Sequence, residues 1–369
     1  MRQVTPSFLL TALLLSLPLG ARAADTPATQ PAAYTHEAAL SLYRQGKYAA
    51  DEALCKAAIA DLEKSDGPNS PKLWPPLNDL AEAYLRVGRF SDARPLITRA
   101  ESVLDKSTRD GALAYAHLCI NKGWLEYSLG DISKAEAIFK EGRDLIRKYE
   151  TKSTVDLAEL INNIGLAYAD NEDEDPAKIK QAKLLLFKSW EMRRLLTGEN
   201  SPETAESLNN IGMHLLFHPD GESDIATALT TLQKSVALAE KVYGKDNPET
   251  AMASTNLAAA HHLLQQDDLA LPEIQNALAI TEKFMGKGSP DRAYELQVLG
   301  QIYQTQQKYK DAEAAYQEAL TITKNCYGPT NIAVAASLDY LSSLYEAMGD
   351  EKKQAETKKQ ITKLRGRDI

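Results

Sequence analysis

One sequence position that carries large side chains recurs along the chain with a period close to 42 residues. It is most often tyrosine, and its successive spacings are 42, 42, 42, 47, 46, 42 and 42 residues, at Leu42, Tyr84, Glu126, Tyr168, Leu215, His261, Tyr303 and Tyr345. A small residue lies three positions before each, namely Ala39, Ala81, Gly123, Gly165, Gly212, Ala258, Gly300 and Ser342. The two longer intervals contain insertions at 170–176 and 218–224. Periods of this length predict a repeat architecture in which every unit has the same fold.

Within each unit the apolar residues are three or four positions apart, as in Leu296, Leu299 and Tyr303. This spacing predicts amphipathic helices, and a short glycine-containing turn divides each unit into two of them. A capping residue followed by proline, such as Ser201-Pro202, precedes the first helix of several units. A serine before a helix accepts hydrogen bonds from the backbone N–H groups of the first turn, which have no partner within the helix. Proline suits the first helical position because it has no backbone N–H that would remain unpaired. Each unit is therefore expected to be a pair of helices.

A period of 42 by itself also fits HEAT or armadillo units. The order of residues within the unit distinguishes these families. A small residue is followed three positions later by an aromatic residue, nine positions after that by alanine, and seven positions further on by another small residue. This order resembles the tetratricopeptide repeat. Three segments, GENSPETAESLNNIG (198–212), GKDNPETAMASTNLA (244–258) and GKGSPDRAYELQVLG (286–300), resemble its 42-residue kinesin-light-chain variety. The resemblance implies an all-α fold, a right-handed α-α superhelical solenoid of about eight helix pairs.

The expected solenoid spans residues 34–369 as an elongated array. Its units are placed near 34–69, 70–111, 112–153, 154–200, 201–246, 247–288, 289–330 and 331–369. Asp51 in the first unit and Gln354 in the last replace the expected alanine. Terminal units of a solenoid carry a polar outer face. These two units are therefore expected to be atypical caps.

The first 23 residues are expected to be a cleaved secretory signal peptide. Arg2 precedes an apolar run from Phe8 to Leu19, and small residues follow at Ala21 and Ala23. The alternative is a membrane anchor, but the run is shorter than the roughly 20 residues that span a bilayer. Residues 24–33 are expected to be a flexible leader. The prediction is an exported protein, periplasmic or secreted, with no integral membrane span after cleavage.

Composition and motifs argue against several classes of activity. The chain is 44% hydrophobic and 25% charged, which is typical of a folded globular protein. Its net charge of −9 disfavours a nucleic-acid partner, because nucleic-acid binders present a basic face. No histidine or cysteine spacing typical of a metal site is present, nor is a phosphate-binding loop or a GxSxG sequence. We therefore expect no enzyme activity, no cofactor, no metal and no catalytic residue.

Stacked first helices predict a concave groove that could hold a peptide. Counting about 100° per residue from the small residue places certain polar and apolar side chains beside the core but outside it. The candidate groove residues are Asn78, Glu82, Trp124, Asn162, Asn209, Met213, Thr255, His262, Gln297 and Gln301. Amide side chains can both donate to and accept from an extended backbone. In similar repeats an asparagine one position later ties neighbouring units, so Asn121, Asn163, Asn210 and Asn256 are expected to be structural.

The function predicted from these features is an exported, non-enzymatic scaffold or adaptor. Its partner would be a peptide or protein of unknown identity, held in the concave groove. The alternative is a structural or self-assembling component of the cell envelope. An enzyme on a helical scaffold is a third possibility, but no constellation of residues supports it.

Overall fold

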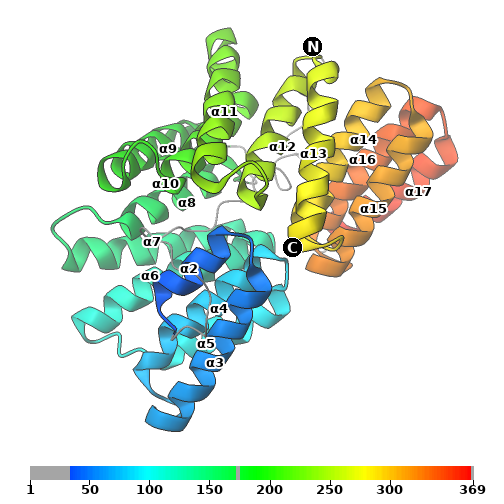
Figure 1. Ribbon diagram of the computed structural model, residues 1–369. Helices are drawn as coiled ribbons and strands as arrows, with labels where there is room; N and C mark the ends of the chain where they lie inside the picture. Colours follow the sequence, from blue (N-terminus) through cyan, green and yellow to red (C-terminus); the bar gives the residue numbers. More distant parts are fainter. Residues whose placement is uncertain (1–33, 172–174, 367–369) are drawn as a thin grey trace.

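The computed structural model describes residues 34–171 and 175–366, so the predicted signal peptide and leader lie outside the described residues. Within these ranges the chain forms sixteen α-helices and one short 3-10 helix, and no strand (Figure 1). The helices make eight consecutive pairs, as the repeat pattern predicted. The helices are α2 His36–Arg44, α3 Tyr48–Asp66, α4 Trp74–Arg86, α5 Phe90–Ser102, α6 Arg109–Ser128, α7 Ile132–Tyr149, α8 Val155–Ala169, α9 Pro176–Thr197, α10 Pro202–Phe217, α11 Glu222–Tyr243, α12 Pro248–Leu263, α13 Asp267–Met285, α14 Pro290–Thr305, α15 Tyr309–Tyr327, α16 Ile332–Met348 and α17 Glu351–Arg365, with η2 at Pro71–Leu73.

The helix ends follow the sequence signals. Ser201 caps α10 by accepting from the backbone N–H of Thr204, and Pro202 is the first helical residue. The preceding helix ends at Gly198, whose φ of 98° lies in the region that glycine favours. The start of α6 differs from the expectation: it begins at Arg109, three residues before the predicted start of the third unit, because Thr108 caps it.

Small residues on the first helix of a unit let the second helix approach closely. A Cβ added to Gly300 would lie 2.4 Å from the ring of Tyr316, and one added to Gly123 would lie 2.2 Å from the ring of Phe139. The aromatic that fills this space therefore comes from the second helix. The tyrosines three residues after the small position contribute less evenly, since Tyr84 and Tyr345 are buried but Tyr168 and Tyr303 are only partly buried.

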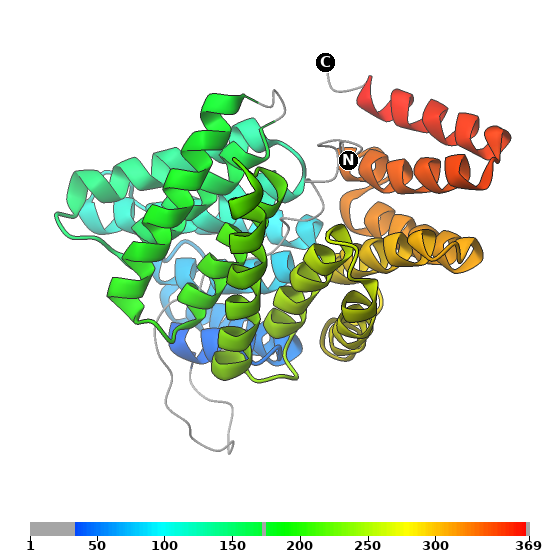
Figure 2. The same cartoon turned by 90° about the horizontal axis from the view of Figure 1, so that it is seen from above.

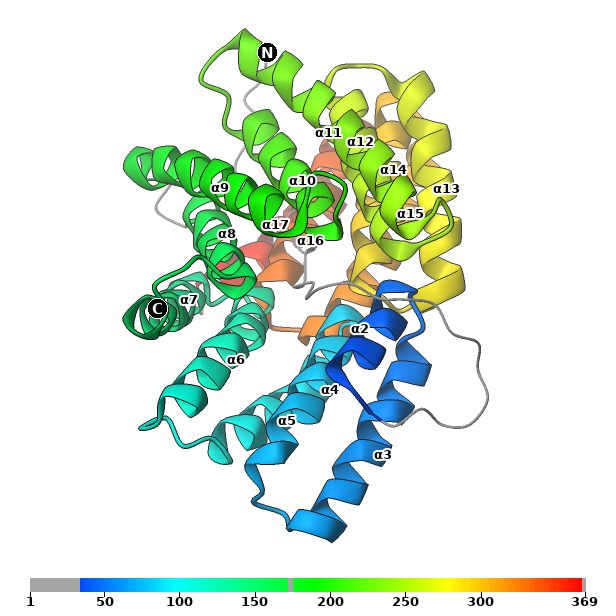
Figure 3. The same cartoon turned by 60° about the vertical axis from the view of Figure 1, so that its left-hand side comes forward.

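The superhelix closes on itself, so that its first three units lie on its last three (Figures 2 and 3). The turns inside units one to three contact the starts of the first helices of units six to eight. Gly46 lies against Pro248, Gly88 against Pro290 and Gly130 against Ile332, and each pair is separated by 202 residues. The expectation of an elongated array is therefore wrong, because the pitch is short enough for successive turns to touch.

We call this contact the seam, and it contains buried ion pairs and a stacked pair of rings. Arg86 of α4 contacts Glu249 of α12 at 2.9 Å and Asp291 of α14 at 2.5 Å, and both Arg86 and Asp291 are almost wholly buried. The rings of Phe90 and Tyr327 stack with centroids 5.0 Å apart. Such a charge cluster is strongly destabilised if one partner is lost, because a buried charge then remains unpaired.

Candidate binding surface on the inner helices

The first helices of successive units pack side by side along the superhelix. Helix α4 contacts α6, α6 contacts α8, and the series continues through α10, α12 and α14 to α16. All ten candidate groove residues lie on these helices. Their side chains are thus on the elements expected to form the groove.

Eight of the ten are buried, which corrects the expectation that they lie outside the core. The buried residues are Asn78, Glu82, Trp124, Asn162, Asn209, Met213, Thr255 and Gln297. His262 and Gln301 are partly exposed. The predicted groove positions follow from a helix with a single packing face. In the closed superhelix a first helix also meets the first helices on either side of it, so positions beside the core become part of the core.

The asparagines form a hydrogen-bonded ladder across neighbouring units. Asn121 donates to Asn78 Oδ1 at 3.0 Å, Asn210 donates to Asn162 Oδ1 at 3.2 Å, and Asn256 donates to Asn209 Oδ1 at 2.9 Å. The structural role predicted for Asn121, Asn210 and Asn256 is therefore confirmed. Their acceptors, Asn78, Asn162 and Asn209, are three of the candidate groove residues.

Asn163 differs from the other three, because it accepts from Asn162 within the same helix, at 3.0 Å. Two other candidates also use their polar atoms inside the protein. Thr255 donates to the carbonyl of Ala251, and Gln297 donates to Ser337 of the next first helix at 3.2 Å. Gln297 therefore joins two units, whereas the hydrogen bonds of Asn163 and Thr255 lie within one helix.

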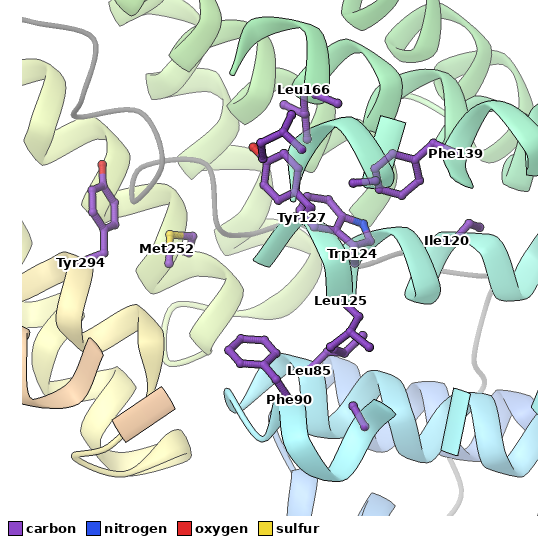
Figure 4. Packing of buried hydrophobic residues seen from close by; sticks show 14 of the residues in the cluster. Leu85, Phe90, Ile120, Trp124, Leu125, Tyr127, Phe139, Leu166, Met252 and Tyr294 are labelled. Atoms are coloured by element: carbon purple, nitrogen blue, oxygen red, sulfur yellow. The ribbon is translucent and has the colours of Figure 1, made fainter. Parts of the chain in front are cut away.

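Apolar and aromatic side chains from distant units gather on the inner side. Figure 4 shows Met252 and Tyr294 on one side of the interior, and Trp124 and Tyr127 of α6 on the other. Trp124 packs edge-on against Tyr127, with ring centroids 5.0 Å apart. Met213, a predicted apolar anchor, is buried in the same continuous cluster.

Several buried polar atoms on the inner helices have no hydrogen-bond partner within the described part of the chain. Among them are Trp124 Nε1, Glu82 Oε1 and the Tyr294 hydroxyl. Burial, together with repulsion from Asp79, raises the pKa of Glu82 well above its ordinary value. A buried polar atom without a partner costs roughly 1–3 kcal/mol. These atoms retain unused hydrogen-bonding capacity, and each is shielded from solvent in the observed structure.

A polar cluster that the sequence did not reveal joins the first helices of units one to four. His36 lies 3.0 Å from Asp79, which also accepts from the Tyr34 hydroxyl at 2.7 Å. His117 lies 3.0 Å from Asp156, and the rings of His36 and His117 meet edge-on. His36 lies three residues before a small residue, as Asn78 does. This shared position in the repeat was the only sequence signal that His36 faces the neighbouring first helix.

The hydrogen bond to Asp79 raises the pKa of His36 above its ordinary value. Burial opposes the charge on His117, but attraction to Asp156 raises its pKa as well. In residues 34–171 and 175–366, no group of three or more histidine, cysteine or acidic side chains is arranged to hold a metal ion. The same ranges contain no helix that is long and apolar enough to cross a membrane.

An open groove of about 410 Å³ lies on the outer side, between α3, α4 and α5. Leu77 and Leu80 contribute apolar surface to it. Charged residues at its rim pair with one another, as Arg99 does with Glu63 at 2.5 Å. Its lining holds three basic and two acidic side chains, and all three basic ones are in ion pairs.

Comparison with known proteins places the repeats in a family. The family model described as tetratricopeptide repeat matches three overlapping segments, 222–283, 252–325 and 291–357. No curated protein matches the chain in sequence.

Several solved structures are similar in fold. A Rap protein complexed with Competence and Sporulation Factor is 12% identical, with a TM-score of 0.59 over 90% of this chain and 97% of that one. BtubC from P. vanneervenii is 19% identical, with a TM-score of 0.45 over 67% of this chain and 93% of that one. The family match falls on units five to eight, and the same paired helices and asparagine ladder run through the preceding units. Residues 222–357 are therefore tetratricopeptide repeats, and the units before them have the same paired-helix fold.

Proposed function

We propose that the chain is an exported scaffold that binds a peptide or an extended segment of a protein partner at its inner helices. The observation that carries the proposal is the set of buried inner polar atoms without partners, Trp124 Nε1, Glu82 Oε1 and the Tyr294 hydroxyl. A peptide backbone supplies carbonyl acceptors and N–H donors for such groups.

The chemistry of the inner surface supports a peptide with apolar side chains. Tryptophan, tyrosine and methionine are side chains that anchor protein partners, because they bury a large area with few rotatable bonds or adapt their shape. Trp124, Tyr294, Met213 and Met252 all belong to the buried inner cluster. Tetratricopeptide arrays bind proteins or peptides, and the Rap protein of similar fold was solved with Competence and Sporulation Factor.

Export rests on the sequence of residues 1–23. The expected mature N-terminus is Ala24, which mass spectrometry of the protein from the cells that make it would identify. Retention of residues 1–23 would contradict both the cleavage and the export proposal.

Site-specific photo-crosslinking in the native extracytoplasmic compartment tests the binding surface. A photoreactive residue in place of His262 or Gln301 should crosslink to a partner protein, since both side chains lie on the first helices and are partly exposed. The matched control is the exposed Gln317 on the second helix α15, from which no crosslink to the same partner is expected. Crosslinks from position 317 but not from positions 262 and 301 would place the interface on the outer helices and overturn the proposal.

A further inference from the structure

Helix α9 carries an unusual share of the exposed apolar surface. Seven large hydrophobic residues are exposed among the described residues, and four of them lie on this helix, at the left of Figure 1. Leu184 is 66% exposed and Leu195 71% exposed, with Phe187 and Leu196 exposed to a smaller degree. Exposed apolar residues that gather on one element mark interaction surfaces, whereas single ones are ordinary.

Leu184 and Leu195 lie on one stripe of α9, and Phe187 and Leu196 lie on either side of it, roughly 70° and 110° away. The opposite face packs on α8 and α10 through buried residues such as Leu186 and Arg193. At about 100° per residue, Leu184, Lys188, Glu191 and Leu195 lie within a narrow sector of the solvent side. We call these four residues, together with Lys180 one turn earlier, the α9 stripe.

Two of the three charged side chains in the stripe are open to a partner, and the third, Glu191, already pairs with Arg194. Lys183 pairs with Asp220 and Asp224, and Arg194 pairs with Glu191 and Glu199. Lys180 and Lys188, in contrast, have no ion-pair partner in the part of the chain that the structure describes. The stripe thus presents two leucines, two unpaired lysines and a carboxylate whose oxygens each retain a second lone pair.

We propose that the α9 stripe is a self-association surface, which pairs with the α9 stripe of a second copy of this chain in an antiparallel arrangement. A twofold axis between positions 189 and 190 places Leu184 opposite Leu195 of the second copy. The same axis places Lys188 opposite Glu191, and Lys180 opposite Glu199, which follows the helix and is 73% exposed on its side chain.

The self-complementary order of the residues favours a second copy over other occupants. A twofold interface requires the same patch to match itself when its direction is reversed. Reversal of this stripe pairs leucine with leucine and lysine with glutamate on both sides of the axis. The helix has 22 residues and is about 33 Å long, so both halves can engage together.

The association is tested by sedimentation velocity on the mature chain between about 1 and 200 μM at low salt. The expected result is a concentration-dependent change from monomer to dimer. Lys188→Glu should weaken dimerisation at least tenfold, because it places like charges across the axis. Adding Glu191→Lys to this variant should restore most of the affinity, because the opposite charges face each other again.

Leu269→Glu is the matched control, since Leu269 is a 53% exposed leucine on α13, and it should dimerise like the unchanged chain. Leu184→Glu should remain monomeric with an unchanged circular dichroism spectrum. A chain that stays monomeric to 200 μM overturns the proposal. So does a double charge exchange that associates no better than Lys188→Glu alone in folded protein.

Discussion

Tyr316 shows how a single side chain joins neighbouring units. It is about 1% exposed, lies over Gly300 of the preceding helix and stacks on Tyr340 of the next unit, with ring centroids 5.4 Å apart. The ring therefore contacts three helices, α14, α15 and α16. Its removal would leave a cavity that the fixed backbone cannot close.

Tyr316→Ala is expected to lower the free energy of unfolding by about 3–5 kcal/mol, as for other buried aromatic side chains. Chemical denaturation, monitored by circular dichroism, measures this change in the free energy of unfolding. Gln301→Ala, one residue after Gly300 and partly exposed, is the control and should change stability by no more than about 0.5 kcal/mol. Equal effects of the two substitutions would contradict the packing described here.

The sequence correctly predicted the surroundings of a residue where a neighbour in the same unit determines them. The small positions at Gly123 and Gly300 were identifiable because a helix pair within one unit requires them. The expectation that Asn162 and Asn209 lie outside the core was wrong, because each accepts a hydrogen bond from an asparagine of the next unit. A helical wheel contains no information on how closely successive units pack.

The first helix, α2, depends on a small set of polar contacts. It has nine residues, and His36 at its start contacts Asp79 of α4, beside Asp156 and His117. Glu37 is the only acidic residue in the first turn of α2. The raised pKa of His36 means that protonation favours the docked helix. Since the folded value exceeds the ordinary value of about 6.5, this contribution is complete below that pH and is lost as the pH rises through the folded value.

Hydrogen exchange of residues 36–44 should therefore show decreasing protection as the pH is raised from 6 to 8.5, after correction for the intrinsic exchange rate. His36→Gln should abolish this pH dependence, because the amide does not titrate. Protection of the central helix α10 serves as the internal control and should change little. An unchanged protection of α2 across this range would contradict the role assigned to His36.

At the scale of the whole molecule, the seam converts an open array into a closed one. The sequence pattern predicted eight helix pairs and their stacking, but it could not predict closure. Closure depends on the small rotation between successive pairs, which accumulates over five units before Arg86 meets Asp291. The spacing of residues within one unit contains no information on this accumulated rotation.

Arg86→Met should destabilise the protein by roughly 3–5 kcal/mol, because Asp291 would be left buried without its ion-pair partner. Burial already raises the pKa of Asp291 to about 6, even with Arg86 beside it. Arg109→Met removes an exposed arginine that pairs with Glu150, and should cost at most about 1 kcal/mol. Equilibrium denaturation of both variants measures the two losses of unfolding free energy. Similar small losses for Arg86→Met and Arg109→Met would contradict a buried seam.

The closed superhelix is the central claim, because the enclosed inner surface exists only if the turns meet. The most direct test is a distance across the seam, measured by double electron–electron resonance between spin labels. The labels would be attached at Arg89→Cys and Asn325→Cys in a Cys326→Ser background, at exposed positions close to Phe90 and Tyr327, whose rings lie 5.0 Å apart. A single short distance, set by that contact and the reach of the labels, is predicted. A distance on the order of 50 Å, as expected if five helix pairs of about 10 Å each separated units two and seven in an open array, would contradict the account.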